Sequence, residues 1–127
     1  MSYAQEKSDI ETFFAANWSH TDIMFENGDY TGQNDEWVRL TVLNGEAYQA
    51  SMGDDPAFRF PGVVVVQIYT KTDKGSGRAL QLADFVDALF RILVLNRINF
   101  KVPQIRRDPN PGEWFQINVS TDFYRGS

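Results

Sequence analysis

The chain has 127 residues, of which 43% are hydrophobic, with no cysteine and a formal net charge of −5 at pH 7. This length and composition predict one folded domain and exclude disulfides, thiol catalysis and zinc–thiolate sites, and the negative charge disfavours strong binding to duplex DNA. The longest uncharged apolar run, Gly62–Thr70, is far shorter than the ~20 residues that span a bilayer, and the charges among the first eighteen residues predict no signal peptide.

The first predicted elements are a helix and a strand. Residues 4–18 carry apolar side chains near helical spacing, which predicts a short amphipathic helix. These side chains are Ile10, Phe13, Phe14 and Trp18. Residues 21–26 are predicted to form a short strand, which a polar, glycine-containing loop at residues 27–35 follows.

A hairpin is predicted next. Glu36–Leu43 alternates apolar and polar side chains, which indicates a strand that is buried on one face. Asn44-Gly45 is typical of a type I′ turn, because both residues tolerate a positive φ. Glu46–Ser51 is therefore predicted to return as the partner strand, and Gly53–Pro61 is expected to be a loop with two exposed phenylalanines.

The middle of the chain predicts a central strand, a glycine loop and a long helix. Gly62–Lys71 is apolar on both faces over its first half, as a central strand is, and residues 78–95 follow the helical spacing of a core-facing helix. The loop Gly75-Ser76-Gly77 stands where nucleotide-binding proteins hold a phosphate. It lacks both the Walker A spacing and the third glycine of a dinucleotide fingerprint. We therefore expect the loop to turn the backbone, with Ser76 as the helix cap, and to bind no cofactor.

The last part of the chain predicts two strands. Ile98–Arg107 is the first, with Pro103 marking an edge or a bulge, and residues 108–112 (DPNPG) form a turn. Glu113–Phe123 is the second, and its strict alternation predicts that Phe115, Ile117 and Val119 face inward. Residues 1–127 thus predict a single α+β domain, in which a mixed, largely antiparallel sheet has two helices packed on one face.

The sequence contains no convincing catalytic or metal-binding constellation. His20 is the only histidine, and we interpret it as a residue at the end of a helix rather than a general base. Asp54-Asp55 precedes a proline and is interpreted as a solvated turn rather than a pair for acid–base catalysis. The protein is predicted not to be an enzyme.

Aromatic and basic residues predict a protein–protein interface instead. Tryptophan, tyrosine, phenylalanine and arginine are enriched at interfaces, and several stand at strand ends, at outward-facing positions such as Tyr124, or around the glycine loop. The predicted interface residues are Trp37, Phe58, Arg59, Phe60, Lys71, Lys74, Arg78, Arg106, Arg107 and Trp114.

The charges are unevenly distributed along the chain. Residues 1–63 hold eleven acids against three bases, whereas residues 64–127 hold nine bases against six acids. One interpretation is ordinary surface scatter. The other is a molecule with two unlike surfaces, through which identical copies meet head to tail. The sequence leaves both open.

The order and spacing of these segments resemble the tail-terminator proteins of long-tailed bacteriophages and prophages, the group related to the lambda tail terminator. Four segments carry the resemblance: the N-terminal helix with the strand and Phe25-Glu26-Asn27-Gly28 after it, Glu36–Gly45, Gly62–Phe90 and Glu113–Phe123. Together they span nearly the whole chain. The loop at residues 28–35 lacks a proline expected in many relatives, and the segment at residues 53–61 is this chain's own.

The resemblance implies a structural role without enzymatic activity. Such proteins form a ring, commonly a hexamer, that caps the finished tail tube, ends its polymerisation and offers a surface for head attachment. The implied partners are further copies of the chain, the tail-tube protein and a head-completion or connector protein, with DNA only passing through the channel and no membrane. The implied location is the head-proximal end of the virion tail, and the host cytoplasm before assembly.

Two alternatives remain. One is a head–tail joining protein or another minor tail protein, which belongs to the same assembly class. The other, from a different class, is a small α+β ligand-binding module or enzyme that uses the loop Gly75–Arg78.

Overall fold

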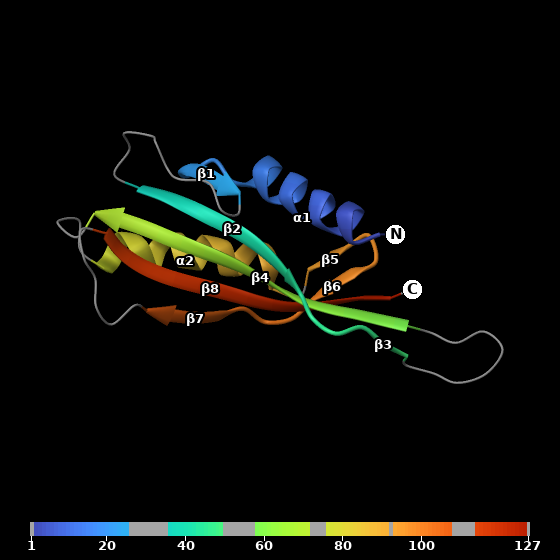
Figure 1. Ribbon diagram of the computed structural model, residues 1–127. Helices are drawn as coiled ribbons and strands as arrows, with labels where there is room; N and C mark the ends of the chain where they lie inside the picture. Colours follow the sequence, from blue (N-terminus) through green and yellow to red (C-terminus); the bar gives the residue numbers. More distant parts are fainter. Residues whose placement is uncertain are drawn as a thin grey trace.

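The computed structural model describes residues 2–25, 36–49, 58–71, 76–91, 93–107 and 114–126. They form two helices and one sheet of eight strands (Figure 1). The elements in chain order are α1 (Tyr3–Asn17), β1 (Asp22–Phe25), β2 (Glu36–Asn44), β3 (Tyr48–Gln49), β4 (Phe58–Lys71), α2 (Ser76–Phe90), β5 (Val94–Leu95), β6 (Ile98–Phe100), β7 (Gln104–Arg107) and β8 (Trp114–Gly126). The predicted α+β class is confirmed.

The sheet is organised around a long antiparallel ribbon of β4 and β8. This ribbon has thirteen paired positions, from Arg59 opposite Gly126 to Lys71 opposite Trp114. On one side β2 pairs antiparallel with β4, and β1 pairs parallel with β2 at the edge. On the other side β6 and β7 both pair antiparallel with β8, and β5 pairs with β6. The sheet is therefore mixed and largely antiparallel, as the sequence predicted.

One face of the sheet, which we call the inner face, forms a single hydrophobic core with both helices. The core side chains of the three long strands are Val38, Leu40, Val42, Val64, Val66, Ile68, Ile117, Val119 and Phe123. Ile10 and Phe14 of α1 and Leu82, Val86 and Phe90 of α2 belong to the same buried cluster. The predicted inward set of β8 is confirmed for Ile117 and Val119, which are fully buried, and Phe115 packs half-buried against the core.

α2 ends earlier than the sequence predicts. The expected helix runs to residue 95, whereas α2 ends at Phe90 and residues 94–95 form β5. Asn96 has a φ of 55° and begins a two-residue turn that pairs Leu95 with Ile98, which is the geometry of a tight hairpin. Leu93 and Leu95 still reach the core, but from the hairpin. Helical spacing therefore gave the correct burial and the wrong element.

The predicted hairpin at Asn44-Gly45 is wrong. β2 does not fold back on itself there, since Asn44 pairs with Gly62, and the chain continues along β4 until Tyr48 pairs with Arg59. Between these two pairs the chain advances four residues from Asn44 to Tyr48, whereas β4 advances only three, from Gly62 to Arg59. One extra residue on one strand is the definition of a β-bulge. The amide of Gly45 keeps the ladder by donating to the carbonyl of Pro61 at 2.9 Å.

The ladder continues because β4 begins at Phe58 and so offers a partner beyond Asn44. Residues 58–61, which the sequence placed in a loop, belong to this strand, and Pro61 lies in it opposite Tyr124. A proline is tolerated beside a bulge, where the regular ladder is interrupted. The backbone hydrogen bonds to β4 thus override the local turn preference of Asn44-Gly45.

A second bulge lies on the other side of the ribbon. Phe100 pairs with Phe123 and Gln104 with Ser120, so that four steps again match three. The amide of Lys101 donates to the carbonyl of Asp122 at 2.8 Å. This bulge contains Pro103 and divides the single predicted strand at residues 98–107 into β6 and β7; of the two predicted roles for Pro103, an edge or a bulge, the structure shows the bulge.

Gly62 is required where the two bulges meet the ribbon. A Cβ atom at this position would lie 2.4 Å from Cζ of Phe123 and 2.7 Å from the carbonyl oxygen of Leu43. The ring of Phe123, the cross-strand partner of Gly62, occupies the place that a side chain would take. Phe123 is thereby 2% exposed, although it lies near the end of the sheet.

A buried ion pair joins α1 to the sheet. Glu6, an acidic residue of the predicted amphipathic helix, is 0% exposed, and Arg125 is 3% exposed. Nε of Arg125 donates to Oε2 of Glu6 at 2.7 Å, and Nδ2 of Asn44 donates to Oε1 at 2.7 Å. The guanidinium also lies over the rings of Phe60, at 4.3 Å, and Tyr3, at 5.5 Å. One carboxylate thus connects α1, β2 and β8.

Candidate interaction surface

The face of the sheet opposite the helices, which we call the outer face, carries neither of the two described helices. In Figure 1 α2 lies behind β4 and β8, so the viewer looks at the outer face. Along β4 its side chains are those that alternate with the core residues, namely Val63, Val65, Gln67, Tyr69 and Lys71, and all five are half-buried. They are shielded by their neighbours on β2 and β8 rather than by a second layer.

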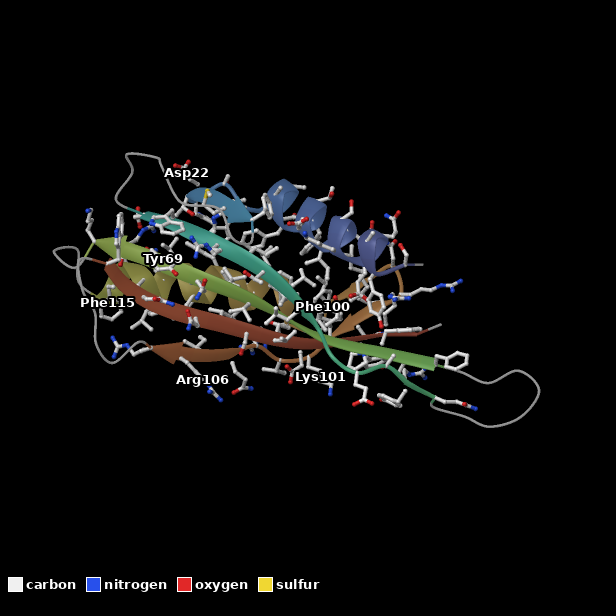
Figure 2. All side chains as sticks on the ribbon, viewed as in Figure 1. Asp22, Tyr69, Phe100, Lys101, Arg106 and Phe115 are labelled. Atoms are coloured by element: carbon white, nitrogen blue, oxygen red, sulfur yellow. The ribbon has the colours of Figure 1, made fainter. Side chains whose placement is uncertain are left out.

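An aromatic–cation cluster occupies one end of the outer face (Figure 2, Tyr69 labelled). The Trp37 ring stacks on Tyr69 with centroids 4.2 Å apart and meets Trp114 edge-on at 6.2 Å. Nζ of Lys71 lies 4.2 Å from the Trp114 ring centroid, and Cζ of Arg39 lies 5.3 Å from that of Trp37. Each such cation–ring contact contributes about 0.5–1 kcal/mol at an exposed site.

This cluster unites three of the predicted interface residues, Trp37, Lys71 and Trp114. Trp37 is only 6% exposed, whereas Arg39, Tyr69, Lys71 and Trp114 around it are half-buried and form the accessible part of the cluster. Tyr69 and Arg39 are not among the predicted residues, because only the register of β2, β4 and β8 brings them to Trp37.

At its other end the sheet has an arm, where β3 pairs with the start of β4 and the end of β8 pairs with the other side of Arg59–Pro61 (Figure 1). We define the arm as β3 and residues 58–61 of β4. Tyr48 on its outer side is 56% exposed and Phe58 on its inner side is 40% exposed. Arg59 lies with Cζ 5.7 Å from the ring of Tyr124. Of the predicted residues on the arm, Phe60 differs from expectation, because it packs half-buried against Arg125 and Tyr3.

The remaining predicted residues are distributed over other parts of the fold. Arg78, in the first turn of α2, forms an ion pair with Glu36 and donates to Oε1 of Gln81 at 2.8 Å. Arg106 and Arg107 are exposed on the edge strand β7, and Cζ of Arg107 lies 5.4 Å from the Phe115 ring. Lys74 lies outside the described residues.

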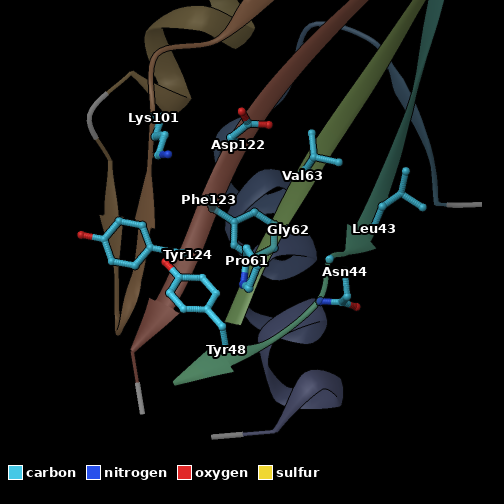
Figure 3. A pocket seen from close by; sticks show the side chains of 11 residues that line it. Leu43, Asn44, Tyr48, Pro61, Gly62, Val63, Lys101, Asp122, Phe123 and Tyr124 are labelled. Carbon is cyan, nitrogen blue, oxygen red and sulfur yellow. The ribbon is translucent and has the colours of Figure 1, made fainter. Parts of the chain in front are cut away.

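A groove of about 390 Å³ opens on the outer face at the base of the arm (Figure 3). Leu43 and Tyr48 line one side, Lys101 and Tyr124 the other, and Val63 contributes to its floor. The groove lies between the two bulges, where the outer strands change register against the ribbon. No local sequence signal reveals it, because it depends on pairing between distant segments.

The glycine loop is described only from Ser76 onward. Ser76 is the first residue of α2, and a Cβ added at Gly77 would meet no atom within 4 Å. Residues 72–75 lie outside the described part of the chain, so the predicted capping by Ser76 stays a prediction. The Asp54-Asp55 pair also lies outside it.

His20 has an aromatic environment. Its ring stacks on Phe85 of α2 with centroids 4.1 Å apart and meets Trp18 edge-on at 5.0 Å. Within the described residues, no group of three or more histidine, cysteine, aspartate or glutamate side chains is arranged to hold a metal ion. Neither of the two described helices is both long enough and apolar enough to cross a membrane.

Comparison with known proteins defines the fold alone. No family model and no curated protein matches the sequence, whereas fifteen chains of solved structures have a similar fold. One of them covers 95% of this chain and 95% of its own length, with a TM-score of 0.66 and 17% sequence identity. It is named only by an identifier, which says nothing of an activity. The chain thus has a known fold, and its function has to be inferred from its surfaces.

Proposed function

We propose that the protein is a structural tail protein of a phage or prophage. In this role it caps the tail tube as a ring of identical copies, ends the polymerisation of the tube and provides the surface to which the head attaches. Its partners are further copies of itself, the tail-tube protein and a head-completion or connector protein. The ring size to test first is a hexamer. It acts at the head-proximal end of the virion tail and binds no cofactor.

The observation that carries this proposal is the arm. The arm exposes an aromatic side chain on each of its two faces, Tyr48 on the outer face and Phe58 on the inner face. A partner that covers the arm removes both rings from water. Exposed aromatics of this kind are typical anchors of protein–protein interfaces, which favours an assembly role over that of a small ligand-binding module.

The outer face gives further support. It presents Trp114 and Lys71 at one end and the groove at the base of the arm at the other. Both lie on the side that neither described helix covers, so one subunit has room for more than one partner. A terminator needs this property, because it contacts its own copies, the tube and the head.

A tube-capping assay tests the proposal. Purified protein is added to growing tail tubes, and tube length and end occupancy are measured by negative-stain electron microscopy. We expect tubes of uniform length with the protein at one end. Phe58→Ser should strongly reduce end occupancy, whereas Leu80→Ser should not, because Leu80 is equally exposed, at 39%, but lies on α2.

Two results would contradict the proposal. If tubes grow past their normal length in an excess of the protein and none of it is found at their ends, the terminator role is wrong. If the protein binds head connectors but not tubes, it is a head–tail joining protein instead.

A further inference from the structure

The two long edges of the sheet carry opposite charge. β1 forms one edge and has Asp22 exposed, and β7 forms the other with Arg106 and Arg107 exposed (Figure 2). β1 belongs to the half of the sequence with eleven acids and three bases, and β7 to the half with nine bases and six acids. The exposed charges of these two edge strands are therefore of opposite sign.

We propose that β7 of one copy pairs with β1 of the next copy, so that the sheet continues from subunit to subunit. The inference rests on the proposed function, because a ring of identical subunits requires a head-to-tail contact between two different patches. It adds which patches these are. Edge strands expose unpaired N–H and C=O groups, and among the described strands β1 pairs only with β2 and β7 only with β8.

The strand directions fit such a contact. β1 is parallel to β2, and each of the steps from β2 to β4, from β4 to β8 and from β8 to β7 is antiparallel. β1 and β7 consequently run in opposite directions. A neighbour placed beside β7 with the same face outward presents its β1 antiparallel to β7. Antiparallel pairing is slightly more stable per residue than parallel pairing.

The side chains also match face by face. Asp22 lies opposite Trp37 and Arg106 opposite Asn118, so both point to the outer face. Ile105 lies opposite Val119 and Phe25 lies opposite Leu40, so both point to the inner face. Ile105 is 42% exposed and Phe25 39% exposed.

A register with Arg106 opposite Asp22 satisfies both faces together. It also sets Ile105 opposite Ile23, with Phe25 as the diagonal neighbour of Ile105. Directly opposite and diagonal side chains interact across antiparallel strands, so the three apolar side chains would pack together. Two arginines on one edge strand repel an identical strand, which disfavours pairing of β7 with β7. The acidic β1 is complementary to it.

Engineered disulfides test this register directly, because the chain has no cysteine of its own. The double variant Asp22→Cys/Arg106→Cys is assembled, with and without tail tubes, oxidised mildly and run on a non-reducing gel. Cβ atoms of directly opposite residues lie ≈ 4.5–5.5 Å apart, close to the ≈ 3.5–4.5 Å of a disulfide. We expect a ladder of linked subunits up to the full ring.

Matched controls identify the contact. A mixture of the two single variants should give dimers only, because each copy then has one reactive edge, and either single variant alone should give none. The double variant Asp22→Cys/Asp84→Cys, whose second cysteine lies exposed on α2, should give no ladder. Arg106→Glu should raise the concentration needed for assembly at least about tenfold, since it places like charges opposite each other, and Asp22→Arg in the same chain should restore assembly.

The outcomes separate this inference from the proposed function. Capped tubes or rings without the ladder overturn the edge pairing and leave the terminator role intact. A ladder with tubes that stay uncapped supports the edge pairing and contradicts the terminator role. If no assembly forms, with or without tubes, both the edge pairing and the terminator role are overturned.

Discussion

Removing one partner of the buried Glu6–Arg125 pair should destabilise the protein severely. Arg125→Met leaves the carboxylate of Glu6, which is 0% exposed, with Asn44 as its only remaining hydrogen-bond donor among the described residues. Breaking a buried pair in this way typically costs ~3–5 kcal/mol, because an uncompensated charge stays out of water. Arg125→Met also removes the stacking of the guanidinium on Phe60 and Tyr3.

This loss is a large part of the stability of a domain, which is ~5–15 kcal/mol in all. For a domain of this size each kcal/mol lowers Tm by roughly 3–5 °C. We therefore expect Arg125→Met to lower Tm by roughly 10–25 °C and to reduce the urea midpoint without a change in m-value. Circular dichroism during thermal and urea unfolding measures both quantities.

Two further variants make the test specific. Arg59→Met removes an arginine that also lies over an aromatic ring but has no ion-pair partner in the described part of the chain, and it should cost less than about 1 kcal/mol. Glu6→Gln/Arg125→Met removes both charges, so it should be less destabilised than the sum of the two single variants. If Arg125→Met costs less than about 1 kcal/mol, or if the two substitutions are additive, the pair does not hold α1 to the sheet.

Two other predictions concern packing. Gly62→Ala should destabilise the protein by about 1–3 kcal/mol, because the added Cβ would overlap Phe123 at 2.4 Å. Gly77→Ala should instead stabilise it by about 0.5–1 kcal/mol, because Gly77 lies in a helix with open space around its Cα. Urea unfolding of both variants measures the difference, and equal effects would refute the close approach at Gly62. Val86→Asp should leave the protein unfolded or aggregated, because Val86 is 0% exposed. Leu80→Asp, on the exposed side of the same helix, should still melt cooperatively. A folded, soluble Val86→Asp variant would show that the wrong face of α2 has been assigned to the core.

The sequence by itself determined which residues face the core. The alternation in β8 and the helical spacing of α2 are local patterns, and each identified buried positions correctly, such as Ile117 and Val86. The sequence also predicted an edge or a bulge at Pro103, because a proline cannot donate to a regular ladder. These properties depend only on which neighbours in the chain are apolar or lack an N–H group.

The tertiary structure decided how those elements are partnered. Asn44-Gly45 has the composition of a tight turn, yet β4 supplies hydrogen-bonding partners beyond it, and the chain bulges instead of turning. Glu6 has the spacing of a solvated helix face, and only the arrival of Arg125, 119 residues later, makes its burial possible.

The same holds for the candidate surfaces. The register of β2, β4 and β8 brings Trp37, Tyr69 and Trp114 together, and the order of the strands places Asp22 and Arg106 at opposite edges. A local pattern specifies the face of a strand through the two-residue period of its side chains. Strand order and register are fixed by hydrogen bonds and packing between segments far apart in the chain, and these contacts exist only once the whole sheet has formed.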